Sequence, residues 1–171
     1  MACALTQNYT LGCRDTAGGI KTLYLIEFDN VSGITESAGT ASAISKANNG
    51  RFWRYDLTLN TGEWNEEYND SRENGTSFHK QNLDFVLNKM QASWSQEIKL
   101  LAQNRIIAVV ADFGSKYWLL GQENGLMREG GKGGSGKAKG DRNGYELKFT
   151  SEQVNPALEV TSGIIAGLIT P

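Results

Sequence analysis

The sequence is poor in the residues that most often carry catalysis and metal binding. It has one histidine and two cysteines among 171 residues. His79 lies far along the chain from Cys3 and Cys13, and a closed zinc site needs four ligands, so no metal or other cofactor is expected. Nucleophilic catalysis has no support either, because no histidine partner stands beside a serine or cysteine. The sequence therefore predicts that the protein is not an enzyme.

Long hydrophobic runs and a charge excess are also missing. No segment reaches the roughly 18 continuous apolar residues of a membrane-spanning helix, so no membrane insertion is expected. The start, Met1–Thr6, has neither the basic region nor the apolar run of a signal peptide, so the cysteines are expected as free thiols in a reducing cytosol. With 17 basic and 19 acidic residues the net charge is -2, which argues against a dedicated nucleic-acid binder.

The composition favours many short strands in a single domain, 1–171, because 20 glycines stand against 2 prolines. After an N-terminal arm, 1–19, the segment Ile20–Phe28 is apolar on both faces and predicts a strand covered on both sides. One face is expected to hold Ile20, Tyr24, Ile26 and Phe28. Residues 29–50 are small and polar with little periodicity, which indicates a long loop or a weak strand.

The next strand alternates, and a polar hairpin follows it. Arg51–Leu59 predicts a half-buried strand that turns Trp53, Tyr55, Leu57 and Leu59 toward the core. Its other face carries Phe52, Arg54, Asp56 and Thr58. The polar segment 60–78 and the strand that returns to Leu87 predict a long hairpin arm whose tip projects beyond the core. The pair Asn74-Gly75 is typical of a type I′ turn.

The second half of the chain predicts one helix and several further strands. Residues 91–104 place Trp94, Ile98, Leu101 and Ala102 on one apolar stripe, with Ser93 as the expected N-cap. A hairpin over 105–120, strands at 145–150 and 158–160, and a C-terminal tail at 161–171 complete the chain. The predicted fold is a β-rich α+β protein, an antiparallel β-sandwich or barrel with one flanking helix and the projecting hairpin.

The glycine-rich segment 128–144 has two possible chemical interpretations. Its stretch GKGGSGK, Gly131–Lys137, has the spacing of a phosphate-binding P-loop. However, Ala138 stands where the magnesium-binding hydroxyl belongs, and the turn-forming residues that follow cannot begin a helix. The segment is also basic, with Arg128, Lys132, Lys137, Lys139 and Arg142, but it has no aromatic residue for base stacking. A solvated basic loop is the favoured interpretation.

The hairpin arm has the opposite charge. Its candidate contact residues are Glu63, Trp64, Glu66, Glu67, Tyr68, Asp70, Arg72 and Glu73. We hypothesise that the acidic arm of one subunit docks near the basic loop of a neighbour in a contact that repeats from subunit to subunit. The alternative is two solvated loops of opposite sign. Trp64 is the expected interface anchor, whereas Trp53, Trp94 and Trp118 are expected in the core and not on a carbohydrate-binding platform.

Three stretches of the sequence resemble one family of proteins. They are LTQNYTLGCRDTAGGIK (Leu5–Lys21), RIIAVVADFGSKYWLLGQENGL (Arg105–Leu126) and GDRNGYELKFTSEQVNPALEV (Gly140–Val160). Together they resemble the tail tube, or major tail, proteins of tailed bacteriophages and prophages of Bacteroidetes-type bacteria. The segment Gly130–Lys139 departs from that family, whose members tend to be shorter and less basic there.

The resemblance implies a structural protein of the virion. Subunits of this family form hexameric rings that stack into a hollow tube for DNA passage, and the arm reaches the adjacent ring. By position, Arg54, Asp56 and Thr58 become candidates for the lumen. The expected partners are copies of the chain, other phage tail proteins and passing DNA without specific binding, in a tail assembled in the host bacterial cytoplasm. The alternatives are a tail terminator, a capsid decoration protein or, from another class, a carbohydrate-binding module.

Overall fold

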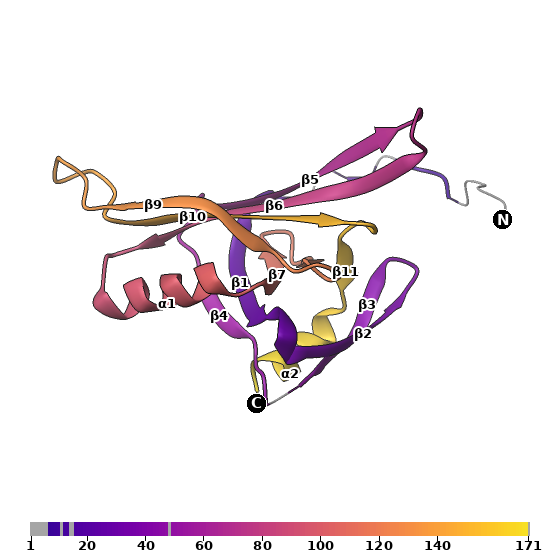
Figure 1. The fold of residues 1–171 in the computed structure, drawn as a ribbon, viewed down its shortest axis with the longest axis horizontal. Helices are drawn as coiled ribbons and strands as arrows, with labels where there is room; N and C mark the ends of the chain where they lie inside the picture. The colour runs from indigo at the N-terminus through magenta and orange to yellow at the C-terminus, as the bar shows by residue number, and fades with distance from the viewer. Residues whose placement is uncertain (1–6, 11, 14–15, 48, 171) are drawn as a thin grey trace.

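The computed structural model of the protein describes residues 7–10, 12–13, 16–47 and 49–170, and it folds them into two β-sheets and one longer helix (Figure 1). The expected state of Cys3 lies outside these residues, and Cys13 is an exposed free thiol. The elements in chain order are β1 (Ile20–Glu27), η1 (Phe28–Asn30), β2 (Val31–Ser37), β3 (Thr40–Lys46), β4 (Trp53–Asp56), β5 (Gly62–Ser71), β6 (Thr76–Asn88), α1 (Ala92–Gln103), β7 (Ile106–Asp112), β8 (Tyr117–Leu120), β9 (Met127–Gly134), β10 (Gly144–Gln153), β11 (Leu158–Val160), η2 (Ser162–Ile164) and α2 (Ile165–Ile169).

The two sheets form a sandwich, which confirms the predicted β-rich α+β class. The larger sheet has seven strands in the order β2-β3-β11-β8-β7-β1-β4, and the smaller has four in the order β5-β6-β10-β9. All neighbouring strands are antiparallel except β3 and β11, which run parallel. The smaller sheet lies across one face of the larger one, and α1 closes one side of the space between them (Figure 1).

The first hydrophobic core fills the space between the sheets. In the smaller sheet Phe85 pairs with Leu147, and the rings of Phe85 and Phe149 stack with their centroids 5.8 Å apart. The apolar stripe of α1 closes this core with Trp94, Ile98 and Leu101, as its spacing predicts. The N-cap of the helix is Gln91, two residues before the expected Ser93.

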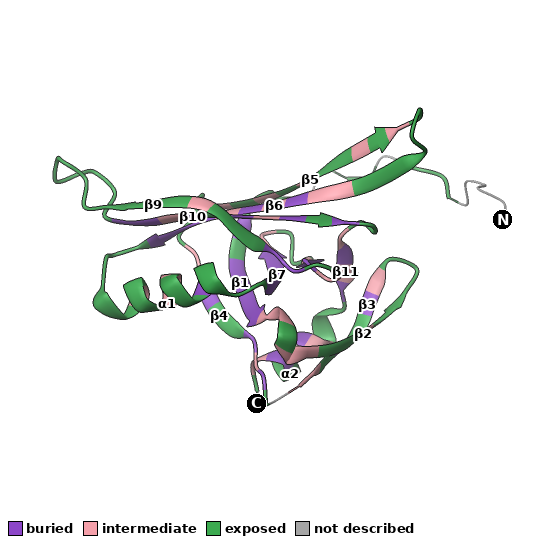
Figure 2. Ribbon diagram, in the orientation of Figure 1, coloured by how far each residue is buried: buried purple, intermediate pink, exposed green. Residues whose placement is uncertain are grey.

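A second core covers the opposite face of the larger sheet, so β1 is buried on both sides as predicted (Figure 2). Its cover includes α2, which occupies the segment expected to be a tail and buries Ile165 and Leu168. One residue of β1 is on the wrong face in the prediction. A shift in register between Ile20 and Thr22 turns Ile20 toward the first core, away from Tyr24 and Ile26.

Residues 29–50 are not a long loop but largely a β-hairpin. Strands β2 and β3 pair from Val31–Lys46 to Ser37–Thr40, and the two residues between them, Ala38 and Gly39, both have positive φ angles. This is the backbone conformation of a two-residue type I′ hairpin turn. The periodicity is weak because several positions carry glycine or serine and the register shifts twice within the pair.

The predicted type I′ turn at Asn74-Gly75 is wrong in type, although the hairpin exists. Ser71 pairs with Thr76, so the loop that joins β5 to β6 has four residues. Only Gly75 within it has a positive φ angle, whereas a type I′ turn needs two such residues.

The strand around Trp53 is shorter and packs differently from the alternation that the sequence shows. Tyr55 is buried in the first core, but the side chains of Trp53 and Leu59 are 46% and 65% exposed. Strand β4 is an edge strand of four residues, so the chain leaves the sheet before Leu59. Phe52 lies outside the strand and is buried in the second core instead.

The expected loop 128–144 is half strand. Its first part is β9, an edge strand that pairs with β10. Gly131 has a φ angle of +156°, and a Cβ atom there would lie 2.5 Å from the carbonyl oxygen of Glu146. The glycines therefore let the backbone of β9 approach β10 closely, and only residues 135–143 form a loop.

Two glycines that face each other across this pair give a test of the packing. A Cβ atom on Gly144 would lie 2.2 Å from the Leu87 carbonyl oxygen, whereas a Cβ atom on its partner Gly134 would meet nothing within 4 Å. We expect Gly144→Ala to lower the free energy of unfolding by about 1–3 kcal/mol, because the backbone of β6 must move. Urea denaturation measures this, with Gly134→Ala as the matched control. Equal losses in both variants would contradict the packing described.

Candidate functional site

The β5–β6 hairpin forms an arm that extends beyond the rest of its sheet (Figure 1). The last residue pair between β10 and β6 joins Gln153 to His79. Beyond it, the pairs from Asn69–Phe78 to Ser71–Thr76 belong to β5 and β6 alone. We call residues 69–78 the arm tip. A two-stranded ribbon with both edges unpaired is marginally stable by itself and is a template for pairing with another chain.

Buried hydrogen bonds anchor the base of the arm. The Glu66 carboxylate accepts hydrogen bonds from the Gln81 side-chain amide at 3.0 Å and from the Ala157 backbone N–H at 2.8 Å. The side chain of Gln81 is fully buried, and its own oxygen accepts a hydrogen bond from the Gly121 N–H at 2.9 Å. These bonds connect both strands of the arm to loops of the larger sheet, so they fix the direction in which the arm leaves the body.

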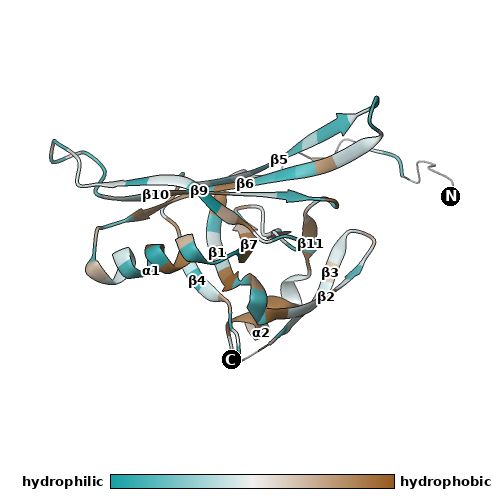
Figure 3. Cartoon of the chain, in the orientation of Figure 1, coloured by the Kyte–Doolittle hydropathy of each residue, from teal (hydrophilic) through white to brown (hydrophobic). Residues whose placement is uncertain are grey.

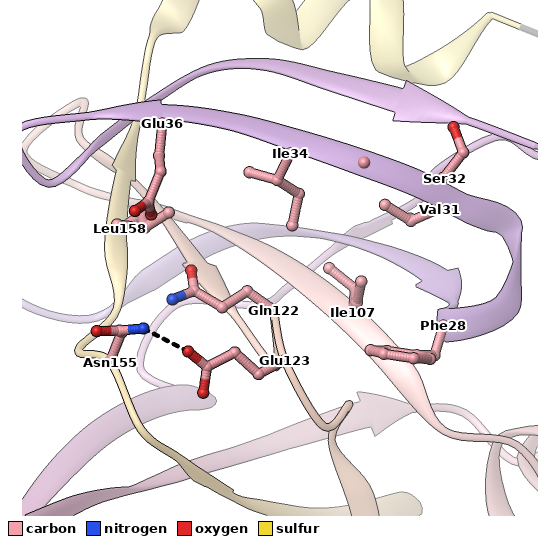
Figure 4. Close-up of a pocket in the computed structure, with 11 residues that line it drawn as sticks. Phe28, Val31, Ser32, Ile34, Glu36, Ile107, Gln122, Glu123, Asn155 and Leu158 are labelled. Carbon is pink, nitrogen blue, oxygen red and sulfur yellow. Dashed lines mark hydrogen bonds between the residues drawn. The ribbon is translucent and has the colours of Figure 1, made fainter.

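A second set of bonds continues this anchor. The buried Gln153 side-chain oxygen accepts a hydrogen bond from the Glu123 N–H at 2.8 Å, and the Gln153 amide donates to the Ser151 hydroxyl. The Glu123 carboxylate accepts bonds of 2.6 Å from the Val154 N–H and from the Asn155 side chain (Figure 4). The loop after β8 and the segment after β10 are thereby held together at the base of the arm.

The predicted arm residues divide into two groups. Trp64 and Glu66 point into the molecule: Trp64 packs against the first core and lies against Trp118, with ring centroids 5.5 Å apart. Trp64, the expected interface anchor, is therefore half-buried against the first core, since this core extends farther under β5 than its polar sequence indicates. The predicted arm residues that are exposed are Glu63, Glu67, Tyr68, Asp70, Arg72 and Glu73.

The tryptophans do not form the flat exposed platform of a carbohydrate-binding module. Trp64 and Trp118 pack on each other, and Trp94 packs against Tyr55 with ring centroids 5.7 Å apart. Trp53 is the exception to the expected core positions, and the Arg51 guanidinium lies 3.7 Å from its ring centre.

Strand β5 and the arm end of β6 are largely hydrophilic (Figure 3), and the polar side chains on the outer face of the smaller sheet pair with one another. Asn82 on β6 donates to Asn65 at 2.8 Å and to Glu67 at 3.2 Å on β5, and it accepts a bond from Thr150 on β10 at 2.9 Å. Ion pairs join Lys148 to Asp84 at 2.5 Å. The polar groups of this face therefore largely satisfy one another across strands, which leaves a surface of mixed charge without a strong field of one sign.

The predicted basic residues do not form one patch. Lys132 on β9 and Arg142 both pair with Glu146, at 3.1 and 3.8 Å. The Arg128 guanidinium donates to the Ile98 carbonyl oxygen of α1 at 3.5 Å. Lys137 and Lys139 are left in the exposed loop 135–143, which lies at the end of the smaller sheet opposite the arm tip (Figure 1).

The loop 135–143 has its own closure and does not have the form of a P-loop. The Asp141 carboxylate accepts hydrogen bonds of 2.8 Å from the backbone N–H groups of Lys137 and Ala138. The segment passes from strand β9 to strand β10 without a helix, whereas a P-loop delivers its glycines to a helix N-terminus. The structure therefore agrees with the rejection of that motif.

The predicted lumen residues lie on the larger sheet. Arg54 and Asp56 are together on edge strand β4, where the Arg54 side chain donates to Asp56 at 2.9 Å. Thr58 lies beyond the strand and accepts a hydrogen bond from Asn88 at 2.6 Å, so the structure does not group it with the other two. The side-chain hydrogen bond with Asp56 raises the pKa of Arg54 above its ordinary value.

Within the described ranges, the titratable residues form no cluster that could hold a metal. No group of three or more histidine, cysteine, aspartate or glutamate side chains is suitably placed there. None of the helices described is long and apolar enough to span a membrane. Comparisons with protein-family models, curated proteins and solved structures gave no match. The geometry of the arm and of the sheet edges is thus the basis for any functional proposal.

Substitutions of the adjacent residues Glu66 and Glu67 test the buried anchor against the exposed surface. We expect Glu66→Lys to lower the free energy of unfolding by about 2–4 kcal/mol, since it removes the acceptor for two donors and places a cation in the anchor. Glu66→Gln keeps an oxygen acceptor and should cost far less. Glu67→Lys, on the outer face, should change stability by about 0.5 kcal/mol or less. Chemical denaturation of the three variants checks this, and equal stabilities for the two lysine variants would contradict it.

The loop closure gives a prediction of pH dependence. Hydrogen bonds from the N–H groups of Ala138 and Lys137 lower the pKa of Asp141 below its ordinary value. A lowered pKa means that the closure is fully present above the ordinary value near 4 and is lost as the pH falls through the lowered one. We expect the protection of the amides of residues 137 and 138 against hydrogen exchange to decrease when the pH is lowered below about 4. Hydrogen exchange measures this protection, and in Asp141→Asn it should not change with pH.

Proposed function

We propose that the protein is a structural subunit that assembles with copies of itself, and that its role is that of a phage tail tube protein. The observation that carries this proposal is the smaller sheet, whose two outer strands, β5 and β9, each have one strand neighbour within the described residues. Soluble monomers usually protect such edges, whereas a closed ring satisfies every edge by pairing it with the next copy.

The pairing that fits is β9 of one subunit against β5 of the next. Both strands are long, with eight and ten residues, and they lie at opposite edges of the same sheet. Strand β9 contains four glycines, Gly130, Gly131, Gly133 and Gly134, so few side chains would obstruct a neighbouring strand. Repeated around a ring, this pairing extends the smaller sheet into a closed barrel with its hydrophilic outer face toward the central channel.

That face suits a channel through which DNA passes. Its charges are paired, as Lys148 with Asp84 and Lys132 with Glu146, so it offers little net attraction to phosphate. In this proposal the face of the smaller sheet takes the place in the lumen that the sequence suggested for Arg54, Asp56 and Thr58.

The arm supplies the contact between rings. Its tip carries Asp70 and Glu73, and the exposed loop at the other end of the same sheet carries Lys137 and Lys139. Opposite charges at opposite ends allow a head-to-tail contact that repeats, and such a contact generates a filament when it does not close. Partners at the ends of the tube would be other tail proteins, in a virion assembled in the bacterial cytoplasm.

Electron microscopy of the purified protein tests the proposal. Stacked rings or tubes support it. Single closed rings that never stack favour a tail terminator, compact monomers that bind glycans favour a carbohydrate-binding module, and compact monomers at high concentration without a ligand contradict self-assembly. Because the edges are completed only by copies of the chain, assembly should rise steeply with protein concentration.

A charge exchange tests the contact between rings. We expect Asp70→Lys with Glu73→Lys to reduce the fraction of stacked rings about tenfold or more, because like charges then face each other. Lys137→Glu with Lys139→Glu should do the same, and the four changes together should restore stacking. Asp29→Lys, on η1 and away from the arm, is the control for charge alone. Failure of the combined variant to recover would contradict this pairing of loops.

A further inference from the structure

A cleft of about 340 Å³ opens between β2 and the loops that carry Gln122 and Asn155 (Figure 4). Its walls are apolar where Ile34, Ile107 and Leu158 line it, and polar at the Glu36 rim. This combination of an apolar interior and a few polar groups is typical of sites that bind a ligand or an anchoring side chain. The cleft lies away from β5 and β9, the edges to which the proposed ring contact is assigned.

Within the described part of the chain, the cleft walls include one buried side-chain acceptor without a hydrogen-bond partner and one strand, β2, with an edge that no other strand pairs with. The side-chain oxygen of Gln122 is buried and accepts no hydrogen bond, and a buried acceptor left unpaired is costly. Strand β2 is one of the two edge strands of the larger sheet and pairs with β3 alone, so its second edge has backbone groups without a strand partner. A hydroxyl or N–H donor can pair with the Gln122 oxygen, and an extended segment of polypeptide can pair with the free edge of β2.

The chain itself carries such a segment. Residues 7–10 are exposed and have no regular secondary structure, and the described residues that precede β1 lie on the side of the arm tip (Figure 1). Tyr9 is 91% exposed, more than any other large hydrophobic side chain described. A tyrosine combines an apolar ring with a hydroxyl donor, and such residues are enriched where protein surfaces bind each other.

We propose that the cleft binds the N-terminal segment of a second copy of the chain, with the Tyr9 ring between Ile34 and Leu158 and its hydroxyl donating to the Gln122 oxygen. The second copy is favoured because the segment is exposed and the cleft is open in the same subunit. Phe28, which directly follows the last residue of β1, lines the cleft, whereas the N-terminal segment precedes the first residue of that strand. This contact is independent of the pairing of β5 with β9 and of the arm tip.

Photo-crosslinking in the full chain tests the proposal. A benzophenone amino acid replaces Tyr9, and the protein is mixed with an equal amount of ¹⁵N-labelled protein before irradiation. The expected result is crosslinks to the segments 28–36, 122–123 or 155–158, with half of them joining a labelled to an unlabelled peptide. Crosslinks only within one subunit, crosslinks to other regions or no crosslink at all would overturn the proposal.

Gly33 provides a way to block the cleft without disturbing the fold. It lines the cleft, and a Cβ atom built there meets nothing within 4 Å. We expect Gly33→Leu to reduce the crosslink yield about tenfold or more, because the leucine occupies the volume that the tyrosine ring needs. Gly163→Leu is the matched control, since Gly163 is exposed, equally open and outside the cleft. Equal yields in the two variants would contradict the site.

Two substitutions of Tyr9 separate the contribution of its ring to binding from that of its hydroxyl. In competition with the crosslinking protein, Tyr9→Ser should compete about tenfold less well than the unmodified chain, and Tyr9→Phe only a few-fold less well, because it keeps the ring and loses one hydrogen bond. If Tyr9→Ser competes as well as the unmodified chain, Tyr9 is not the anchor.

Failure of the cleft contact and failure of the tube proposal give different experimental results. If rings and tubes form and Gly33→Leu leaves the crosslinks unchanged, the cleft contact is wrong while the tube proposal stands. If the crosslinks reach the cleft of a second copy in particles that never form rings, the cleft contact stands and the tube proposal is wrong.

Discussion

The arm exists because β6 is longer than the sheet that supports it. Ten of its thirteen residues pair with β10, from Asn88 to His79, and the rest continue with β5 as their only neighbour. The apolar end of β6, with Leu83, Phe85 and Leu87, is held in the first core, so the polar end cannot be drawn in. The two ends of β6 therefore lie in different environments. One end is in the hydrophobic core, and the other is exposed to water or, in the proposed assembly, to another subunit.

At the junction between these two environments, polar side chains are buried, and burying them without hydrogen bonds would cost free energy. Gln81 is fully buried, and an unpaired amide there would cost more free energy than the hydrogen bond itself contributes. Glu66 and the Gly121 N–H satisfy it, and in doing so they connect the arm to the larger sheet. The arm is consequently rigid at its base and marginal at its tip. In the proposed assembly, that combination would hold the arm in a fixed direction and let its last residues adjust to the neighbouring subunit.

The sequence predicts the elements whose residues act locally. The helix at 91–104, the alternation at Tyr145–Phe149 and the strand Leu158–Val160 depend on periodicity within one segment, and the structure confirms them. Prediction fails where a partner decides the outcome. Gly131 looks like loop sequence, but β10 gives it a strand to pair with. Ile20 changes face because β1 has an extra residue where its pairing with β7 shifts register, between Ile20 and Thr22. Trp64 lies in a polar segment but contacts Trp118 from a distant strand.

The same dependence on partners is the reason why the proposed function is assigned to the strand edges. No strand in the described residues completes the backbone edges of β5, β9 and β2 on their outer side. Pairing an edge with a copy of the chain adds hydrogen bonds and buries surface at a fixed register, and each addition leaves a new edge of the same kind. Growth by identical steps is therefore what the proposed assembly implies for this arrangement of strands.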